Sequence, residues 1–235
     1  MKYLQTEQLN EAECSNDAVK SSQLLELRLN ELKQLLAEQG NTLSVTEQAK
    51  ALLDMGYILI DLDRKAEAWQ VAKQAFELAL PREAWNQAVE ACDVMYQAEQ
   101  DESLKAMVHG IWLGVTFPID PELSVAMLHH LTEETPDNSD GGAVAAAVAC
   151  YVVDMRAEGK QRSDLQFFTS QMLGQIARRH SRVDTQDLFD FWVERMQLND
   201  PALFIPRLGK ILDVVVPANE WWFDRDELRN KIPVD

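Results

Sequence analysis

Glycine and cysteine are scarce in this sequence, and no segment alternates between apolar and polar residues as a β-strand does. It has nine glycines among 235 residues, and no run of alternating β-branched residues predicts a sheet. The three cysteines, Cys14, Cys92 and Cys150, lie far apart and match no zinc or disulfide spacing. These absences predict an all-α protein with reduced thiols.

A long hydrophobic run is also missing. The longest weakly polar run, Gly141 to Val153, is too short to cross a bilayer. The N-terminal residues Met1 to Glu7 lack the apolar core of a secretion signal. We therefore expect a cytoplasmic protein that does not bind membranes.

Basic residues are outnumbered by acidic ones, 22 against 39, which gives a net charge of −17. The excess concentrates between Asp101 and Asp140, where eight acids face one base, Lys105. Such a chain repels nucleic acid. The acidic surface either keeps the protein soluble or steers a basic partner segment.

The only basic cluster, Arg178 to Arg182, falls where a helix is expected to end. Cations at that position complement the helix dipole. A site for phosphate or for an acidic peptide is the alternative interpretation.

Helical patterns fill the rest of the chain. The segment from Ser21 to Gln39 carries one apolar stripe, which either caps the core or forms a dimer seam, and consists of Leu25, Leu29, Leu32 and Leu36. Cap signals predict five further helix starts, at Ser44, Asp120, Ser163, Asp184 and Asp200.

Three further features concern the second half of the chain and the loop that precedes it. The alanine-rich segment from Ala143 to Ala157 predicts a central buried helix. Pro206 is expected to kink or divide the helix that begins at Asp200. The segment from Thr135 to Gly142 predicts a loop that separates two halves of the chain.

Residues 50–118 contain two copies of a helix-turn-helix pattern, each closed by a proline. The first copy consists of Leu52, Met55, Gly56, Leu59, Glu67, Ala68, Ala72, Ala75 and Pro81. The second begins 33 residues later and consists of Trp85, Ala88, Val89, Cys92, Leu104, Val108, Ile111 and Pro118. The pattern resembles the tetratricopeptide repeat, a pair of antiparallel helices with small residues where they cross. We expect Ala68 and Ala75 to be buried there.

The second copy departs from that family's pattern, because leucine, valine and isoleucine stand where the family prefers alanine. The resemblance implies an α-solenoid-like bundle of antiparallel hairpins over residues 21–135, after a loosely ordered segment 1–20. Two repeats are too few for a stable stack, so the helical region 143–235 is expected to pack on them and cap them. The regions could also form one domain.

In the tetratricopeptide family, the first helices of successive units line a groove that holds other proteins. By resemblance, one wall of the groove is largely apolar and consists of Lys50, Leu53, Tyr57 and Ile60. The other is largely acidic and consists of Glu83, Asn86, Glu90 and Asp93. This combination suits an amphipathic partner segment with basic residues.

Three adjacent aromatic residues, Trp221, Trp222 and Phe223, follow Pro217. They cannot all face one core from a helix. Either this tail folds back onto the protein, or Trp221 and Trp222 anchor a partner.

A metal site is the main catalytic alternative. His129 and His130 each precede a carboxylate by four residues, Glu133 and Glu134, which lies one helical turn away. A zinc site takes at least three protein ligands, so a distant residue such as His109 would have to join them. A surface helix with charge pairs explains the same spacing.

Other catalytic signatures are weak or missing. Cys92 or Cys150 with His109 would make a nucleophile and a base, but both cysteines sit in apolar helical patterns, where inert thiols are the norm. The sequence contains no glycine-rich phosphate loop, serine elbow or dinucleotide fingerprint.

The sequence thus predicts a non-enzymatic adaptor, assembly chaperone or accessory subunit without a cofactor. Its expected partner is another protein with a basic or amphipathic segment, and self-association stays open. The alternative is an all-helical enzyme that uses the histidine and glutamate cluster with a divalent metal.

Overall fold

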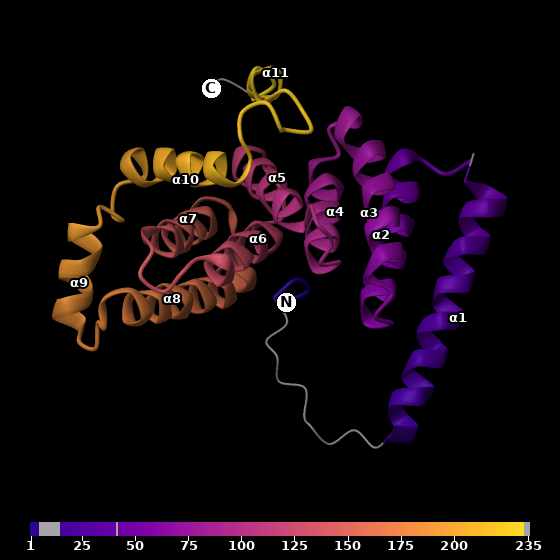
Figure 1. Cartoon of the computed structure of the whole chain (residues 1–235), viewed down its shortest axis with the longest axis horizontal. Coiled ribbons are helices and arrows are strands. Elements are labelled where there is room, and N and C mark those ends of the chain that lie inside the picture. The colour runs from indigo at the N-terminus through magenta and orange to yellow at the C-terminus, as the bar shows by residue number, and fades with distance from the viewer. Residues whose placement is uncertain (5–14, 41, 233–235) are drawn as a thin grey trace. The chain divides into compact units, whose positions relative to one another are not determined.

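The computed structural model describes residues 1–4, 15–40 and 42–232, and helices account for 77% of them. No strand occurs within these ranges, which confirms the all-α prediction. The helices, shown in Figure 1, are α1 (Ser15–Gln39), α2 (Val45–Asp61), α3 (Lys65–Ala79), the short 3₁₀ helix η1 (Leu80–Arg82), α4 (Trp85–Gln97), α5 (Ser103–Thr116), α6 (Pro121–Glu134), α7 (Asp140–Arg156), α8 (Gly159–Ser181), α9 (Gln186–Arg195), α10 (Pro201–Val215) and α11 (Arg225–Arg229). None of these helices is both long and apolar enough to span a membrane.

The chain divides into two compact units. The N-terminal unit comprises residues 5–110, and the C-terminal unit comprises residues 1–4 and 111–235. The division falls inside α5. The connection between α6 and α7, where the sequence suggested a separating loop, therefore lies within the C-terminal unit, in which these two helices pack together.

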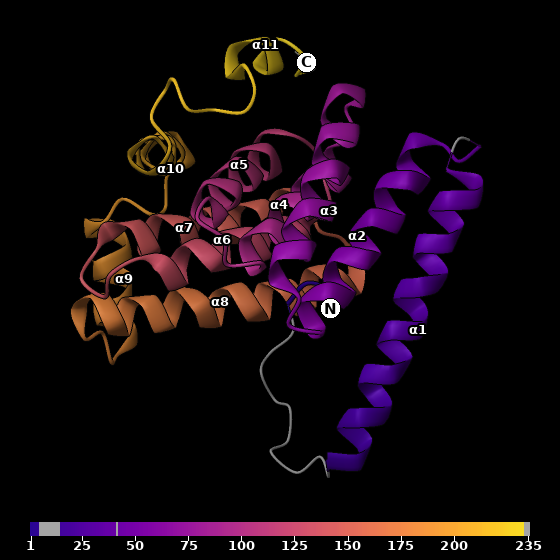
Figure 2. The same ribbon diagram turned by 45° about the vertical axis from the view of Figure 1, so that its right-hand side comes forward.

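Small residues allow the helices of the N-terminal unit to pack closely. Figures 1 and 2 show α2, α3 and α4 side by side, and α3 contacts both of the others. Ala68 and Ala75 on α3 are fully buried, as predicted. A β-carbon placed on Gly56 would lie 2.7 Å from Cγ1 of Val94, so α2 and α4 approach at a point where a larger residue would force Val94 to shift.

Helix α1 packs along α2 in the same unit. Its stripe residues Leu29 and Leu32 are buried, as expected of a capping helix. The helix begins at Ser15, not at Ser21. Of the segment expected to be loosely ordered, residues 5–14 lie outside the described part.

Residues 1–4 belong to the C-terminal unit. The backbone amide of Tyr3 donates a hydrogen bond to Oε1 of Glu122 on α6 at 2.7 Å, and Leu4 is buried. This start of the chain is thus held by hydrogen bonds.

Helix α7 is the centre of the C-terminal unit, as its alanine content predicted. It packs against α6, α8 and α10, and Figure 2 shows α8 and α10 on different sides of it. Every residue from Gly141 to Ala149 is buried. Alanine permits this because its short side chain lets three neighbouring helices come close.

The predicted helix starts are partly correct. Ser44 forms a capping box with Glu47, and the side chains of Asp120 and Asp200 cap α6 and α10. Ser163, however, lies inside α8, which begins four residues earlier at Gly159, and Thr185 rather than Asp184 caps α9.

Pro206 does not divide α10, which runs from Pro201 to Val215. Proline removes one backbone donor, and the remaining bonds keep the helix continuous.

The glycines at 141 and 142, which were expected in a loop, also belong to a helix, the first turn of α7. There, a β-carbon on Gly142 would lie 2.8 Å from Oγ1 of Thr135.

The aromatic tail folds back within the C-terminal unit. The ring centroids of Trp221 and Phe223 lie 6.1 and 5.3 Å from that of Trp112 on α5. Arg225 stacks over Trp221 at 4.2 Å and forms an ion pair with Asp213 at 2.7 Å. Cation–π contact and ring packing thus hold the tail.

Candidate functional site

The predicted groove residues come from neighbouring helices of the N-terminal unit. The hydroxyl of Tyr57 on α2 donates a hydrogen bond to Oδ2 of Asp93 on α4 at 2.8 Å. The Gln97 amide donates to the same oxygen, also at 2.8 Å. The structure therefore brings the two expected walls together and uses Asp93 to join them.

Three of the groove residues are buried. The exposed fraction of Asp93 is 2%, that of Glu90 is 6%, and that of Leu53 is 1%. The accessible groove residues are half-buried or exposed, namely Lys50, Tyr57, Ile60, Glu83 and Asn86. The acidic wall therefore exposes little of the negative charge expected to attract a basic segment, because Glu90 and Asp93 are buried and Asp93 accepts two hydrogen bonds.

The aromatic pair at the tail is half-buried. Trp221 packs between Phe223 and Arg225, and Trp222 retains some exposed surface. The folding of the tail back onto the C-terminal unit therefore explains the position of Trp221.

The histidine and glutamate cluster on α6 includes the pair His129 and Glu133. Nδ1 of His129 lies 3.9 Å from Oε1 of Glu133, and the His129 ring stacks on Phe168 of α8 at 5.3 Å. Burial lowers the pKa of His129 below its usual range, and Glu133 opposes that shift. His130 is half-buried and Glu134 exposed. Within the described ranges, no group of three or more candidate ligands is placed to hold a metal ion.

Of the two described cysteines, Cys92 is buried and Cys150 is half-buried. Burial raises the pKa of Cys92 well above its usual range, and it raises that of Cys150 as well. Both thiols are therefore protonated at neutral pH and poor nucleophiles. The third cysteine, Cys14, lies outside the described residues.

Most of the basic cluster serves the fold. Arg179 donates to the carbonyl oxygen of Thr132 at 2.7 Å and to Oγ1 of Thr135 at 3.1 Å, which satisfies the C-terminal end of α6. Nε2 of His180 lies 3.2 Å from Oδ1 of Asp140. The cluster ends α8 as predicted, with Arg182 in the left-handed conformation.

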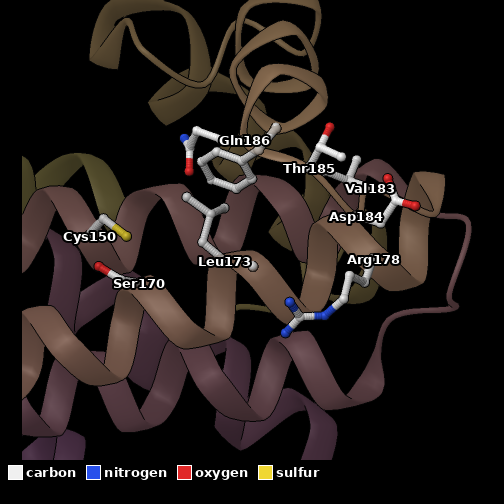
Figure 3. A pocket seen from close by; sticks show the side chains of 10 residues that line it. Cys150, Ser170, Leu173, Arg178, Val183, Asp184, Thr185 and Gln186 are labelled. Atoms are coloured by element: carbon white, nitrogen blue, oxygen red, sulfur yellow. The ribbon is translucent and has the colours of Figure 1, made fainter.

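Arg178 differs from these neighbours, because it lines a pocket of about 610 Å³ in the C-terminal unit. The pocket lies between α7, α8 and the start of α9, and its lining consists of Cys150, Ser170, Leu173, Gly174, Arg178, Val183, Asp184, Thr185, Gln186 and Phe189. In Figure 3, Leu173 projects from α8 with Cys150 and Ser170 to one side and Arg178 to the other. The volume is in the range of small-molecule sites.

Sequence reasoning named an anion site at the basic cluster as an alternative but missed the pocket beside Arg178, and it also missed an exposed pair of leucines on α1. Leu24 and Leu27 are 68% and 59% exposed, on a different side of α1 from the buried Leu29 and Leu32. The signal was available, since leucines at both 24 and 25 exceed what one stripe needs. For the pocket, the signals were the basic cluster that contains Arg178 and Gly174 inside a strongly helical segment.

Comparison with protein-family models, with curated protein sequences and with solved structures found no match for this chain. The tetratricopeptide pattern thus stays a resemblance carried by the residues quoted above.

Proposed function

We propose that this protein is a non-enzymatic interaction protein, an adaptor, assembly chaperone or accessory subunit that binds another protein through its N-terminal unit. The observation that carries the proposal is the exposed pair Leu24 and Leu27 on α1. They are three residues apart, so they are neighbours on the helix surface. Burying a leucine side chain contributes about 1.5–3 kcal/mol, so a partner that covers both would gain substantially.

The form of α1 supports this use. One face packs on α2 through Leu29 and Leu32, and Arg64 ties the helix to the α2–α3 turn through Glu26 at 3.2 Å. The outward leucines are therefore presented on a supported helix. Amphipathic helices commonly bind partners through such spaced apolar anchors.

The expected partner segment is amphipathic and carries basic residues, because the chain has a net charge of −17. Attraction between opposite charges mainly raises the association rate. It should therefore weaken as salt rises and screens exposed charges beyond about 8–10 Å. The accessible groove residues form a second candidate surface in the same unit.

The test begins with affinity purification from the native cell and identification of a co-purifying protein, followed by binding measurements with both proteins purified. The variant Leu24→Ser/Leu27→Ser should weaken binding at least tenfold while the melting temperature stays nearly unchanged, because both side chains are exposed. A matched control is Leu188→Ser/Leu203→Ser, which removes two exposed leucines of the C-terminal unit. The control should bind as the wild type does.

Two results would count against α1 as the contact surface. Equal binding by the α1 variant and the wild type would remove α1 as the contact surface. Loss of binding in a Lys50→Glu/Glu83→Lys variant, with α1 silent, would move the contact to the groove. Failure to find any protein that binds the purified chain would overturn the function itself.

A further inference from the structure

The pocket in the C-terminal unit contains a cation that the fold does not use. Arg178 is exposed and, within the described ranges, its side chain makes no ion pair or hydrogen bond. Its neighbours Arg179 and His180 have defined partners. Fold stability thus accounts for Arg179 and His180. Arg182 also makes no side-chain ion pair within the described ranges, but of these two unpaired arginines only Arg178 lines the pocket.

Gly174 is the second unusual feature of the pocket. It lies inside the long helix α8, where glycine costs about 0.5–1 kcal/mol relative to alanine. A β-carbon at this position would have no atom within 4 Å, so no close helix contact requires glycine. Its effect is to leave open space beside Arg178, one helical turn away.

The remaining lining residues define the chemistry. Leu173, Val183 and Phe189 offer apolar surface, and Ser170 and Thr185 offer hydroxyl groups. A guanidinium matches a carboxylate through two parallel hydrogen bonds. A doubly charged phosphate fits less well, because Arg178 is the sole cation in the lining and Asp184 adds a negative charge.

We propose that this pocket binds a carboxylate attached to an apolar group, with Arg178 binding the carboxylate and Leu173, Val183 and Phe189 contacting the apolar group. The carboxylate belongs either to a free organic acid or to the C-terminus of a peptide. Both sources present the same chemistry. The inference is independent of the partner surface on α1.

The test is a titration of the isotope-labelled full chain with each probe, in which the NMR signals of the backbone amides report binding. The probes are octanoate, its neutral counterpart octanamide, a short peptide that ends in leucine with a free carboxylate, and the same peptide with an amidated end. We expect saturable shifts at pocket residues with octanoate, the free-acid peptide or both. The neutral counterparts should bind at least tenfold more weakly.

Variants separate the pocket from general surface binding. Arg178→Gln should weaken binding about tenfold or more, as expected for loss of a charged hydrogen bond. Gly174→Leu should abolish it by filling the open space. The matched controls are Arg182→Gln, which removes a nearby charge outside the pocket lining, and Gly209→Leu, which adds the same bulk to α10, where a β-carbon also meets no atom within 4 Å. Both controls should bind as the wild type does.

The outcomes distinguish the sources and can overturn the proposal. Binding by octanoate alone identifies a free acid, and binding by the free-acid peptide alone identifies a peptide terminus. The proposal is wrong if neither acid gives saturable shifts. It is also wrong if the neutral probes bind equally well, or if Arg178→Gln and Gly174→Leu bind as tightly as their controls.

Discussion

Two helix-interior glycines, Gly56 in the N-terminal unit and Gly174 in the C-terminal unit, have opposite surroundings. In the N-terminal unit, a β-carbon on Gly56 would lie 2.7 Å from the buried side chain of Val94. In the C-terminal unit, a β-carbon on Gly174 would meet no atom within 4 Å. Glycine in α2 is therefore explained by packing, whereas glycine in α8 is not. Gly56 thus lies in a closed interior, and Gly174 lies beside an open pocket.

The largest effect is expected where the N-terminal unit is most tightly packed. Ala68 is fully buried on α3, so Ala68→Leu should overpack the interior and lower the free energy of unfolding by roughly 1–3 kcal/mol. Urea denaturation measures this change. Ala66→Leu is the control, because Ala66 is exposed on the same helix and should change stability by less than about 0.5 kcal/mol. Equal stability of the two variants would show that the interior around Ala68 accommodates a leucine side chain without loss of stability.

Gly56→Ala tests the same interior with one carbon atom. Overpacking costs about 1–3 kcal/mol, and the better helix propensity of alanine returns about 1 kcal/mol. We expect a net loss of about 1 kcal/mol in the free energy of unfolding, measured by urea denaturation. A gain in stability would mean that Val94 moves aside and that packing does not explain the glycine.

Local patterns were enough to predict much of this fold. Ser44, Asp120 and Asp200 cap helices because their side chains accept hydrogen bonds from nearby backbone amides, and such signals depend on a few adjacent residues. The start of α8 was not predicted, because it has no such local signal. Glu158 precedes that helix without any side-chain capping bond, so the sequence carries no local mark there.

The candidate sites were harder to predict, because they depend on contacts between distant residues. Asp93 was expected to face a partner, but the Tyr57 hydroxyl, 36 residues away, binds it in a buried position. The pocket likewise joins Cys150 on α7, Arg178 on α8 and Phe189 on α9. No spacing rule within one helix reveals such a meeting.

Gly174→Ala should change the free energy of unfolding in the opposite direction to Gly56→Ala. The added methyl group enters open space, so only the helix propensity changes, and the free energy of unfolding should rise by about 0.5–1 kcal/mol. Gly209→Ala in α10 is the matched case, with equally open surroundings, and should give a similar gain. A loss of stability at Gly174 alone would mean that the pocket side of α8 is as closed as the interior around Gly56.

The smallest effect concerns another side of α8, where Phe168 stacks on His129 of α6. Burial lowers the pKa of His129, so the unfolded chain binds this proton more readily than the folded one. The resulting stability is present above the unfolded pKa, about 6.5, and is lost as pH falls through the lower folded pKa. Urea denaturation at pH 7.5, 6.5 and 5.5 should therefore show a steeper decline for the wild type than for His129→Gln. Parallel declines would mean that water reaches His129 freely, and that this side of α8 is as open as the side that carries Gly174.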